Sequence, residues 1–319
     1  MNEVKLPALT GDSPLGILAA IGLLRLLDSF TDDSPRLRWD RTDLTAVLCG
    51  RHDNVEGIIV DLQSIVGSVP PGSSLPGVGP GFPPPGAAPD RLRVSQSELP
   101  QTAATLTGNM SPSERLEAER WLASLVTDLT ENGGKVAISQ FMAPFAKQST
   151  ATMLEKPLGS IRNEPDYLRQ ALVGWRRVAG VTGEYLDHRA MWDAAQDGSG
   201  STGSMRGVPG ATWLALMSYP LLRTTASRKR VLSSGWHVVR RNTRTESELR
   251  LPVWSQPLGT TGITVLLEHP VLDRPQQVVA SRAREERALL ETLGIIHVCR
   301  ARRYKADDAK FAGVLTVVK

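Results

Sequence analysis

The pattern of apolar and polar positions predicts a buried helix near the N-terminus. Every residue in 15–24 is apolar or glycine. Pro14 suits the first helical position because no N–H donor is needed there. Asp12 or Ser13 can accept a hydrogen bond from the free N–H groups of the first turn. The small side chains within 16–22 leave room, so we expect another backbone to approach this helix closely.

Alternating and helical periodicities predict further strands and helices along the chain. We expect strands at 37–40, 44–49, 136–142, 231–239, 249–254, 263–267, 295–301 and 311–318. We expect helices at 55–69, 111–130, 150–156, 165–175, 211–219 and 283–293. The sum is an α+β fold, with mixed sheet elements at both ends of the chain and an α-helical middle.

Changes in composition divide the chain into four segments. The stretch 70–89 (PPGSSLPGVGPGFPPPGAAP) is rich in proline and glycine and carries no charge. Such a composition predicts a mobile loop, either a linker between domains or a long insertion. The expected segments are an N-terminal α/β segment at 1–69, a Pro/Gly-rich linker or insertion at 70–92, a mainly helical region at 93–222 and a basic, β-rich C-terminal region at 223–319.

The charge is distributed unevenly, which changes the picture of the C-terminal region. Residues 221–319 carry 18 Lys and Arg against 9 Asp and Glu, whereas 1–220 carry 19 against 24. A basic region of this kind can bind a polyanion. It can equally be a solvated face that docks on the acidic part of the same chain.

Three clusters supply this basic charge, with aromatic residues between them. Arginines in such clusters can pair with phosphates while aromatic rings stack on bases. A charge run of this kind is also compatible with a solvated surface, and tryptophan also serves to fill large gaps in a core. The candidate nucleic-acid-binding residues are Arg228, Lys229, Arg230, Trp236, Arg240, Arg241, Arg244, Arg300, Arg302, Arg303, Tyr304 and Lys305.

Several classes of protein are excluded or disfavoured by what the sequence lacks. The two cysteines, Cys49 and Cys299, form no CxxC pair, which excludes a disulfide framework and a cysteine-rich zinc site and suits a reducing cytoplasm. No phosphate loop, dinucleotide fingerprint or nucleophile elbow occurs, and the histidines have no metal-ligand spacing, so we expect neither a cofactor nor a metal. The apolar run at 15–24 is shorter than the ~20 residues of a membrane span, and we expect a cytoplasmic protein without a membrane partner.

One stretch has the residue types of an acid/base site. Glu184, Asp187, His188 and Arg189 lie within six positions, and on a helix Glu184 and His188 would share one face. A carboxylate beside an imidazole can act as an acid/base pair, which would make the protein a nuclease or another hydrolase. The alternative is a hydrogen-bonded network that fixes a loop.

Three stretches carry a resemblance to a known family: LTGDSPLGILAAIGLLR at 9–25, GVPGATWLAL at 207–216 and LPVWSQPL at 251–258. They resemble accessory proteins of type I-G (formerly I-U) CRISPR loci. That group includes the large-subunit family of the interference complex and a family similar to the C-terminal extension of the helicase-nuclease.

The resemblance implies a non-catalytic subunit of an RNA-guided DNA interference complex that serves antiviral defence. Its expected partners are CRISPR RNA, target DNA, the other subunits of the complex and the helicase-nuclease. In such complexes base pairing reads the sequence while protein subunits hold the strands by charge. A third hypothesis is a protein adaptor that binds through the apolar N-terminal helix and contacts no nucleic acid.

Overall fold

A computed structural model describes residues 1–85, 90–131, 133–142, 149–181, 183–190, 206–227, 230–241, 244–273, 280–304 and 313–318. Its N-terminal part is a three-stranded antiparallel sheet with strand order β1-β3-β2, flanked by two helices. The elements are β1 (Asn2–Thr10), α1 (Pro14–Phe30), β2 (Arg36–Trp39), β3 (Thr45–Gly50) and α2 (Val55–Ser68). Helix α1 begins as the sequence predicts, because the Ser13 side chain accepts a hydrogen bond from the Gly16 N–H at 3.3 Å.

The middle of the chain is mainly helical and contains short hairpins. The elements are α3 (Leu99–Thr107), α4 (Pro112–Leu125), β4 (Val126–Thr130), β5 (Val136–Ile138), α5 (Thr150–Asn163), α6 (Asp166–Val173), β6 (Val178–Ala179), η1 (Gly183–Tyr185), β7 (Arg206–Gly207), α8 (Pro209–Met217) and η3 (Tyr219–Leu221).

The C-terminal part contains the β8–β9 hairpin and a four-stranded antiparallel sheet with strand order β10-β11-β12-β13. The elements are β8 (Thr224–Ser227), β9 (Arg230–Ser233), β10 (Trp236–Arg241), β11 (Arg244–Trp254), α9 (Thr260–Leu267), η4 (Pro270–Asp273), α10 (Ala280–Thr292), β12 (Ile295–Tyr304) and β13 (Val314–Val317). Helices and antiparallel sheets together confirm the predicted α+β class.

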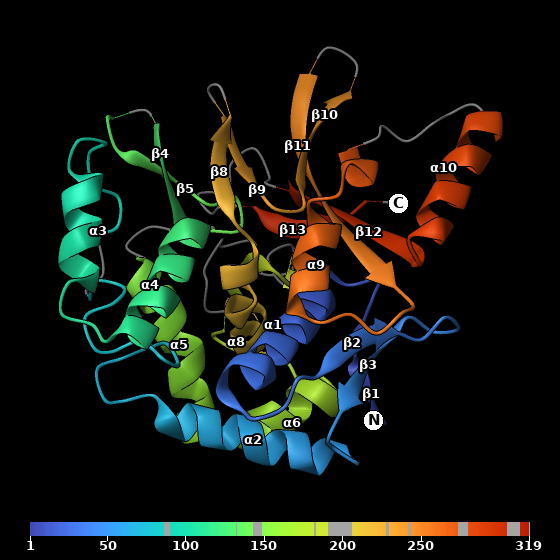
Figure 1. Ribbon diagram of the computed structural model, residues 1–319, viewed down its shortest axis with the longest axis horizontal. Helices are drawn as coiled ribbons and strands as arrows, with labels where there is room; N and C mark the ends of the chain where they lie inside the picture. The colour runs from blue at the N-terminus through green and yellow to red at the C-terminus, as the bar shows by residue number, and fades with distance from the viewer. Residues whose placement is uncertain are drawn as a thin grey trace.

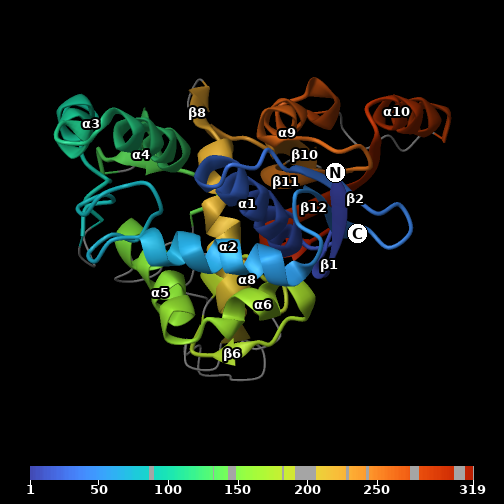
Figure 2. The same ribbon diagram turned by 60° about the horizontal axis from the view of Figure 1, so that its bottom comes forward.

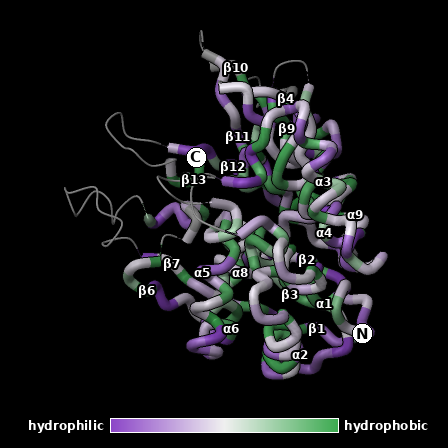
Figure 3. Tube along the Cα trace, turned by 90° about the vertical axis from the view of Figure 1, so that its left-hand side faces the viewer, coloured by the Kyte–Doolittle hydropathy of each residue, from purple (hydrophilic) through white to green (hydrophobic). Residues whose placement is uncertain are grey.

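Helix α1 runs through the centre of the molecule, with α8 packed along it (Figure 1). Turning the view shows α2 crossing in front of α8 below α1, α6 beneath α2, and α9 with strands β10 and β11 above α1 (Figure 2). The apolar stretches of the chain gather inside, where α1 and α8 lie (Figure 3). Among the helices that the structure describes, none has both the length and the apolar character that crossing a bilayer requires.

The close approach predicted for α1 is confirmed at Gly22. A Cβ atom built on Gly22 would lie 1.7 Å from the carbonyl oxygen of Leu214 in α8. Only a residue without a side chain fits there, because any Cβ would overlap the neighbouring backbone. The small residues therefore serve a helix–helix contact within this chain.

One hydrophobic cluster joins the two ends of the chain. Trp39 and Trp254 meet edge to face with ring centroids 6.0 Å apart, and the Trp254 indole N–H donates to the Leu37 carbonyl at 2.7 Å. Leu37 also exchanges two backbone hydrogen bonds with Leu258. The same cluster contains buried residues from each of the four expected segments.

The Pro/Gly-rich stretch differs from its prediction in residues 70–85, which pack against the body of the protein. Leu75, Val78 and Phe82 are at most 2% exposed and belong to the common core. The glycines provide close packing here, because a Cβ on Gly77 would lie 2.7 Å from the Phe30 ring. Isolated apolar anchors among turn residues therefore stabilise a segment whose average composition suggests disorder. Residues 86–89 lie outside the described part of the chain.

Several element boundaries also differ from the predictions. Residues 263–267, predicted as a strand, belong to α9, where Ile263, Leu266 and Leu267 are buried at helical spacing. Helix α4 ends at Leu125 and not near residue 130, because the chain becomes extended at Val126 and pairs with β5.

Two further differences come from a turn and a proline. The expected strand at 231–239 is divided by a turn at Gly235 (φ +80°) into β9, which pairs with β8, and β10, which pairs with β11. Helix α5 continues through Pro157 to Asn163, although proline removes one helical hydrogen bond.

Candidate nucleic-acid interface

The antiparallel register brings the second and third basic clusters to one end of the C-terminal sheet. Arg241 and Arg244 face each other where β10 turns into β11. Strand β12 runs alongside β11, so that Arg302 reaches Glu246, two positions from Arg244, at 2.7 Å. The first cluster belongs to the neighbouring hairpin, because β9, which contacts β10, begins at Arg230. Figure 1 shows both hairpins rising from the same side of the molecule.

The side chains of this end are described only in part. Arg230 is exposed, and Tyr304 is 55% exposed at the end of β12. Arg228, Lys229 and Lys305 lie outside the described residues. Arg240, Arg241 and Arg244 are placed by their strands alone, and their side chains are likewise outside the description.

Three arginines of this sheet surround one buried carboxylate. Glu248 is 0% exposed and accepts hydrogen bonds from Arg250 at 2.9 Å, Arg300 at 2.8 Å and Arg302 at 2.5 Å. Residues 248 and 250 alternate onto one face of β11, where Arg300 is the direct partner of Arg250. We call Glu246, Glu248, Arg250, Arg300 and Arg302 the Glu248 cluster.

The electrostatics of the Glu248 cluster follow from its geometry. Burial alone would raise the pKa of Glu248, but the hydrogen bonds from Arg302, Arg300 and Arg250 outweigh it and lower the pKa to about 2. The carboxylate is therefore charged at neutral pH and holds the three guanidinium groups in fixed positions. Part of the basic charge predicted at Arg300 and Arg302 is neutralised by this carboxylate inside the protein.

The remaining candidates face the interior. Trp236 is 5% exposed and packs edge to face on Phe141 at 5.8 Å, so its ring faces are covered in this structure. Arg303 points to the core side of the sheet and donates to the carbonyls of Phe141 at 2.7 Å and Gly313 at 3.1 Å. Trp236 and Arg303 thus hold the sheet on the loop that contains Phe141.

His237 lies beside the Glu248 cluster, since it is the register partner of Glu248 on β10. Its Nδ1 atom is 2.6 Å from Asp273 Oδ1, and its Nε2 atom has no hydrogen-bond partner among the described residues. Burial lowers the pKa of His237, with Asp273 opposing the shift. Sequence reasoning did not single out this pair, because Asp273 follows 36 positions later and only the folded sheet brings it to His237.

Two of the four acid/base candidates, Asp187 and Arg189, form an ion pair. The chain makes only a short 3₁₀ turn at Gly183–Tyr185, so the helical face predicted for Glu184 and His188 is absent, and the Glu184 side chain lies outside the described residues. Asp187 is 1% exposed and pairs with Arg189 at 2.8 Å and Arg177 at 3.4 Å. This arrangement resembles the alternative interpretation, a network that fixes a loop.

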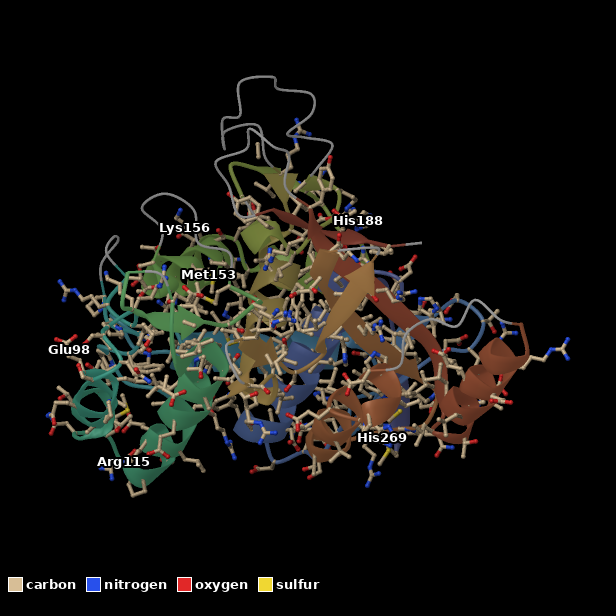
Figure 4. All side chains as sticks on the ribbon, turned by 90° about the horizontal axis from the view of Figure 1, so that it is seen from above. Glu98, Arg115, Met153, Lys156, His188 and His269 are labelled. Carbon is tan, nitrogen blue, oxygen red and sulfur yellow. The ribbon has the colours of Figure 1, made fainter. Side chains whose placement is uncertain are left out.

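Within the described ranges, no group of three or more His, Cys, Asp or Glu side chains is arranged to hold a metal ion. Figure 4 shows His188 and His269 on opposite sides of the molecule.

The basic runs of the sequence do not reveal the carboxylates of the Glu248 cluster. The signal was present in the strand alternation, since Glu246, Glu248 and Arg250 lie two positions apart and therefore share a face. Their pairing with β12 could not be read without the register.

Comparisons with known proteins add no assignment to this geometry. No protein-family model matches the chain, and no curated protein sequence matches it significantly.

Proposed function

We propose that this protein is a non-catalytic, cytoplasmic subunit of a type I CRISPR RNA-guided DNA interference complex, and that it grips a nucleic-acid strand at the hairpin end of its C-terminal sheet. The partners proposed are CRISPR RNA, target DNA, the other subunits of the complex and the helicase-nuclease. The family part of this proposal rests on the resemblance of residues 9–25, 207–216 and 251–258.

The observation that carries the proposal is the convergence of basic residues from separate stretches of sequence. Arg230 on β9, Arg240 and Arg241 on β10, and Arg244 on β11 belong to two adjacent hairpins. Tyr304 is exposed beside them and offers a ring on which a base can stack.

The mechanism is electrostatic. Each Lys or Arg that neutralises a phosphate releases condensed counterions, so affinity falls steeply with salt. The Glu248 cluster supports the grip from within, because its buried carboxylate fixes Arg300 and Arg302 and thereby the end of β12.

The test is charge reversal at the hairpin end. The triple variant Arg240→Glu, Arg241→Glu, Arg244→Glu is expected to bind labelled single-stranded RNA and DNA at least ~10-fold more weakly and to lower the slope of log K against log salt by about 2–3. Fluorescence anisotropy at several salt concentrations measures both quantities.

The matched control carries the same change of charge elsewhere. Arg36→Glu, Arg115→Glu and Lys156→Glu reverse exposed side chains on β2, α4 and α5; Figure 4 marks Arg115 and Lys156 on the helical side of the molecule. Equal losses in both triple variants, or binding that does not depend on salt, would contradict the proposal. Co-purification with partner subunits that survives nuclease treatment and both triple variants would favour the adaptor hypothesis instead.

A further inference from the structure

Helix α10 covers the polar face of the C-terminal sheet incompletely. None of its described side chains is fully buried. Leu289 and Leu290 of this helix and Leu293 just after it are only partly buried against the core. Two cavities remain between α10 and β12, one of about 190 Å³ and one of about 590 Å³. Both are lined by Glu286, Leu290 and Val298, so they adjoin, and we call the two together the α10 groove.

The two ends of the α10 groove differ in chemistry. Its inner end is walled by Arg250 and Arg300, two members of the Glu248 cluster. Its outer, wider end is lined by Arg41, Arg287 and His297. Arg41 comes from the turn between β2 and β3, and its guanidinium donates a 2.9 Å hydrogen bond to Ser255.

The floor between these ends is apolar. Ile296 and Val298 of β12 and Leu290 of α10 line it, whereas Glu286 and Glu291 of α10 are the acidic side chains at the groove. Cavities of roughly 300–1,000 Å³ with an apolar lining and a few fixed polar groups are typical small-molecule sites. The wider cavity lies within this range by volume, and charged and apolar residues share its lining.

We infer that the α10 groove binds one nucleotide unit of a single nucleic-acid strand, with its phosphate at Arg41 and Arg287 and its base over the apolar floor toward Arg300. A duplex does not fit this arrangement, because its bases are stacked and paired and cannot enter a channel beneath a helix. The inference rests on the proposed function and adds that the bound strand is single and that one base leaves the stack. The groove lies on the same sheet as the hairpin end, with Arg300 nearer the hairpins and Arg41 at the other end of β12.

The experiment measures binding of nucleoside 5′-monophosphates to the full chain by isothermal titration calorimetry, with inorganic phosphate and the uncharged nucleosides in parallel. We expect the monophosphates to bind more tightly than phosphate or nucleoside alone. Arg287→Glu should weaken this binding about 10-fold, as expected for the loss of a charge-assisted contact. Arg284→Glu, an exposed residue of α10 that lines neither cavity, should change it less than about 2-fold.

A second pair of variants tests whether an acidic side chain at the groove weakens monophosphate binding. Glu291→Lys should tighten monophosphate binding about 3-fold, whereas Glu285→Lys, exposed on the same helix but outside the groove lining, should not. In oligonucleotide titrations the wild type should prefer single strands to a duplex of the same sequence, and parallel RNA and DNA arms identify which sugar is preferred.

The outcomes separate this inference from the proposed function. The hairpin triple variant should still bind monophosphates like the wild type. Monophosphates that fail to bind while oligonucleotides bind through the hairpins would overturn the groove and leave the proposed function standing. Phosphate binding as tight as monophosphate binding, or equal effects of Arg287→Glu and Arg284→Glu, would also overturn it.

Discussion

At the scale of single residues, the C-terminal sheet is organised around Glu248. A buried carboxylate that holds three guanidinium groups is costly to desolvate, so the cluster is tolerated only because its hydrogen bonds are complete. Removing the negative charge leaves the arginines of the same face to repel one another. The cluster therefore specifies one register of β11 against β12.

We expect Glu248→Gln to lower the free energy of unfolding by about 3–5 kcal/mol, the range observed when one partner of a buried ion pair is removed. Urea titration followed by circular dichroism measures this change. The control is Glu246→Gln, whose side chain is 40% exposed and pairs with Arg302; we expect a loss below about 1 kcal/mol. Similar losses in the two variants would show that burial of the carboxylate is not what matters.

The shifted pKa of the same carboxylate predicts how the stability of the protein depends on pH. The pKa of Glu248 is about 2 in the folded protein against an ordinary value of 4.5. Because the folded pKa is depressed, the contribution to stability is complete above about pH 4.5 and is lost as the pH falls toward 2. Between these limits the wild type should lose roughly 3 kcal/mol more than Glu248→Gln. Parallel stability curves for the two proteins would contradict this assignment.

At the scale of elements, close backbone contacts with α1 and α6 fix the position of α8. Gly22 permits the backbones to touch, and Gly210 does the same between α8 and α6, where a Cβ would lie 2.0 Å from the Tyr167 carbonyl oxygen. Helix α8 is thus locked between two neighbours by glycines whose role is steric.

Gly22→Ala should destabilise the protein by several kcal/mol or prevent folding, because the added methyl group meets backbone that cannot move aside. The control is Gly67→Ala in α2, where nothing lies within 4 Å of the new Cβ. That variant should be neutral or up to about 1 kcal/mol more stable, as alanine is favoured over glycine in helices. The melting temperatures of the two variants measure this difference. A Gly22→Ala variant that is as stable as the wild type would disprove the close packing.

The elements that the sequence predicts well are those with local signals. The cap at Ser13, the apolar run of α1 and the alternation of β11 identify their own structure. Residues 263–267 were misassigned because β-branched Ile263 and Val265 favour strands, while the tertiary contacts of Ile263 and Leu267 select a helix.

The candidate site was less predictable than the elements. Basic runs are visible in the sequence, but whether an arginine faces solvent or a buried carboxylate depends on strand pairing. Arg302 is neutralised by residues 54 and 56 positions away, and Trp236 is covered by Phe141 from the middle of the chain. Charge composition alone carries none of this.

At the scale of the whole molecule, the first and last thirds of the chain pack against each other and share one core. A Cβ on Gly11 would lie 2.9 Å from the side chain of Val253, so the turn before α1 packs directly on β11. Trp39 and Trp254 extend this contact. Part of the apolar face of the C-terminal sheet is thus covered by the N-terminal part of the chain.

We therefore expect a fragment of residues 223–319 to be unfolded when produced alone, despite its four-stranded sheet. Circular dichroism and the dispersion of amide proton shifts measure this directly. Mixing the fragment with a separately produced 1–222 chain is expected to restore strand signal, because the missing cover is then present. A cooperatively folded isolated fragment would contradict the single shared core.

The buried position of α1 also has a consequence for biosynthesis. The apolar stretch 15–24 is fully covered only when α8 has been made, about 180 residues later. Translation at 5–20 residues per second leaves this stretch uncovered for roughly 10–40 s. During this interval the nascent chain presents 15–24 to the cell as a chaperone-binding segment. Ribosome-bound chains halted before α8 should therefore recruit chaperones more strongly than chains halted after β13.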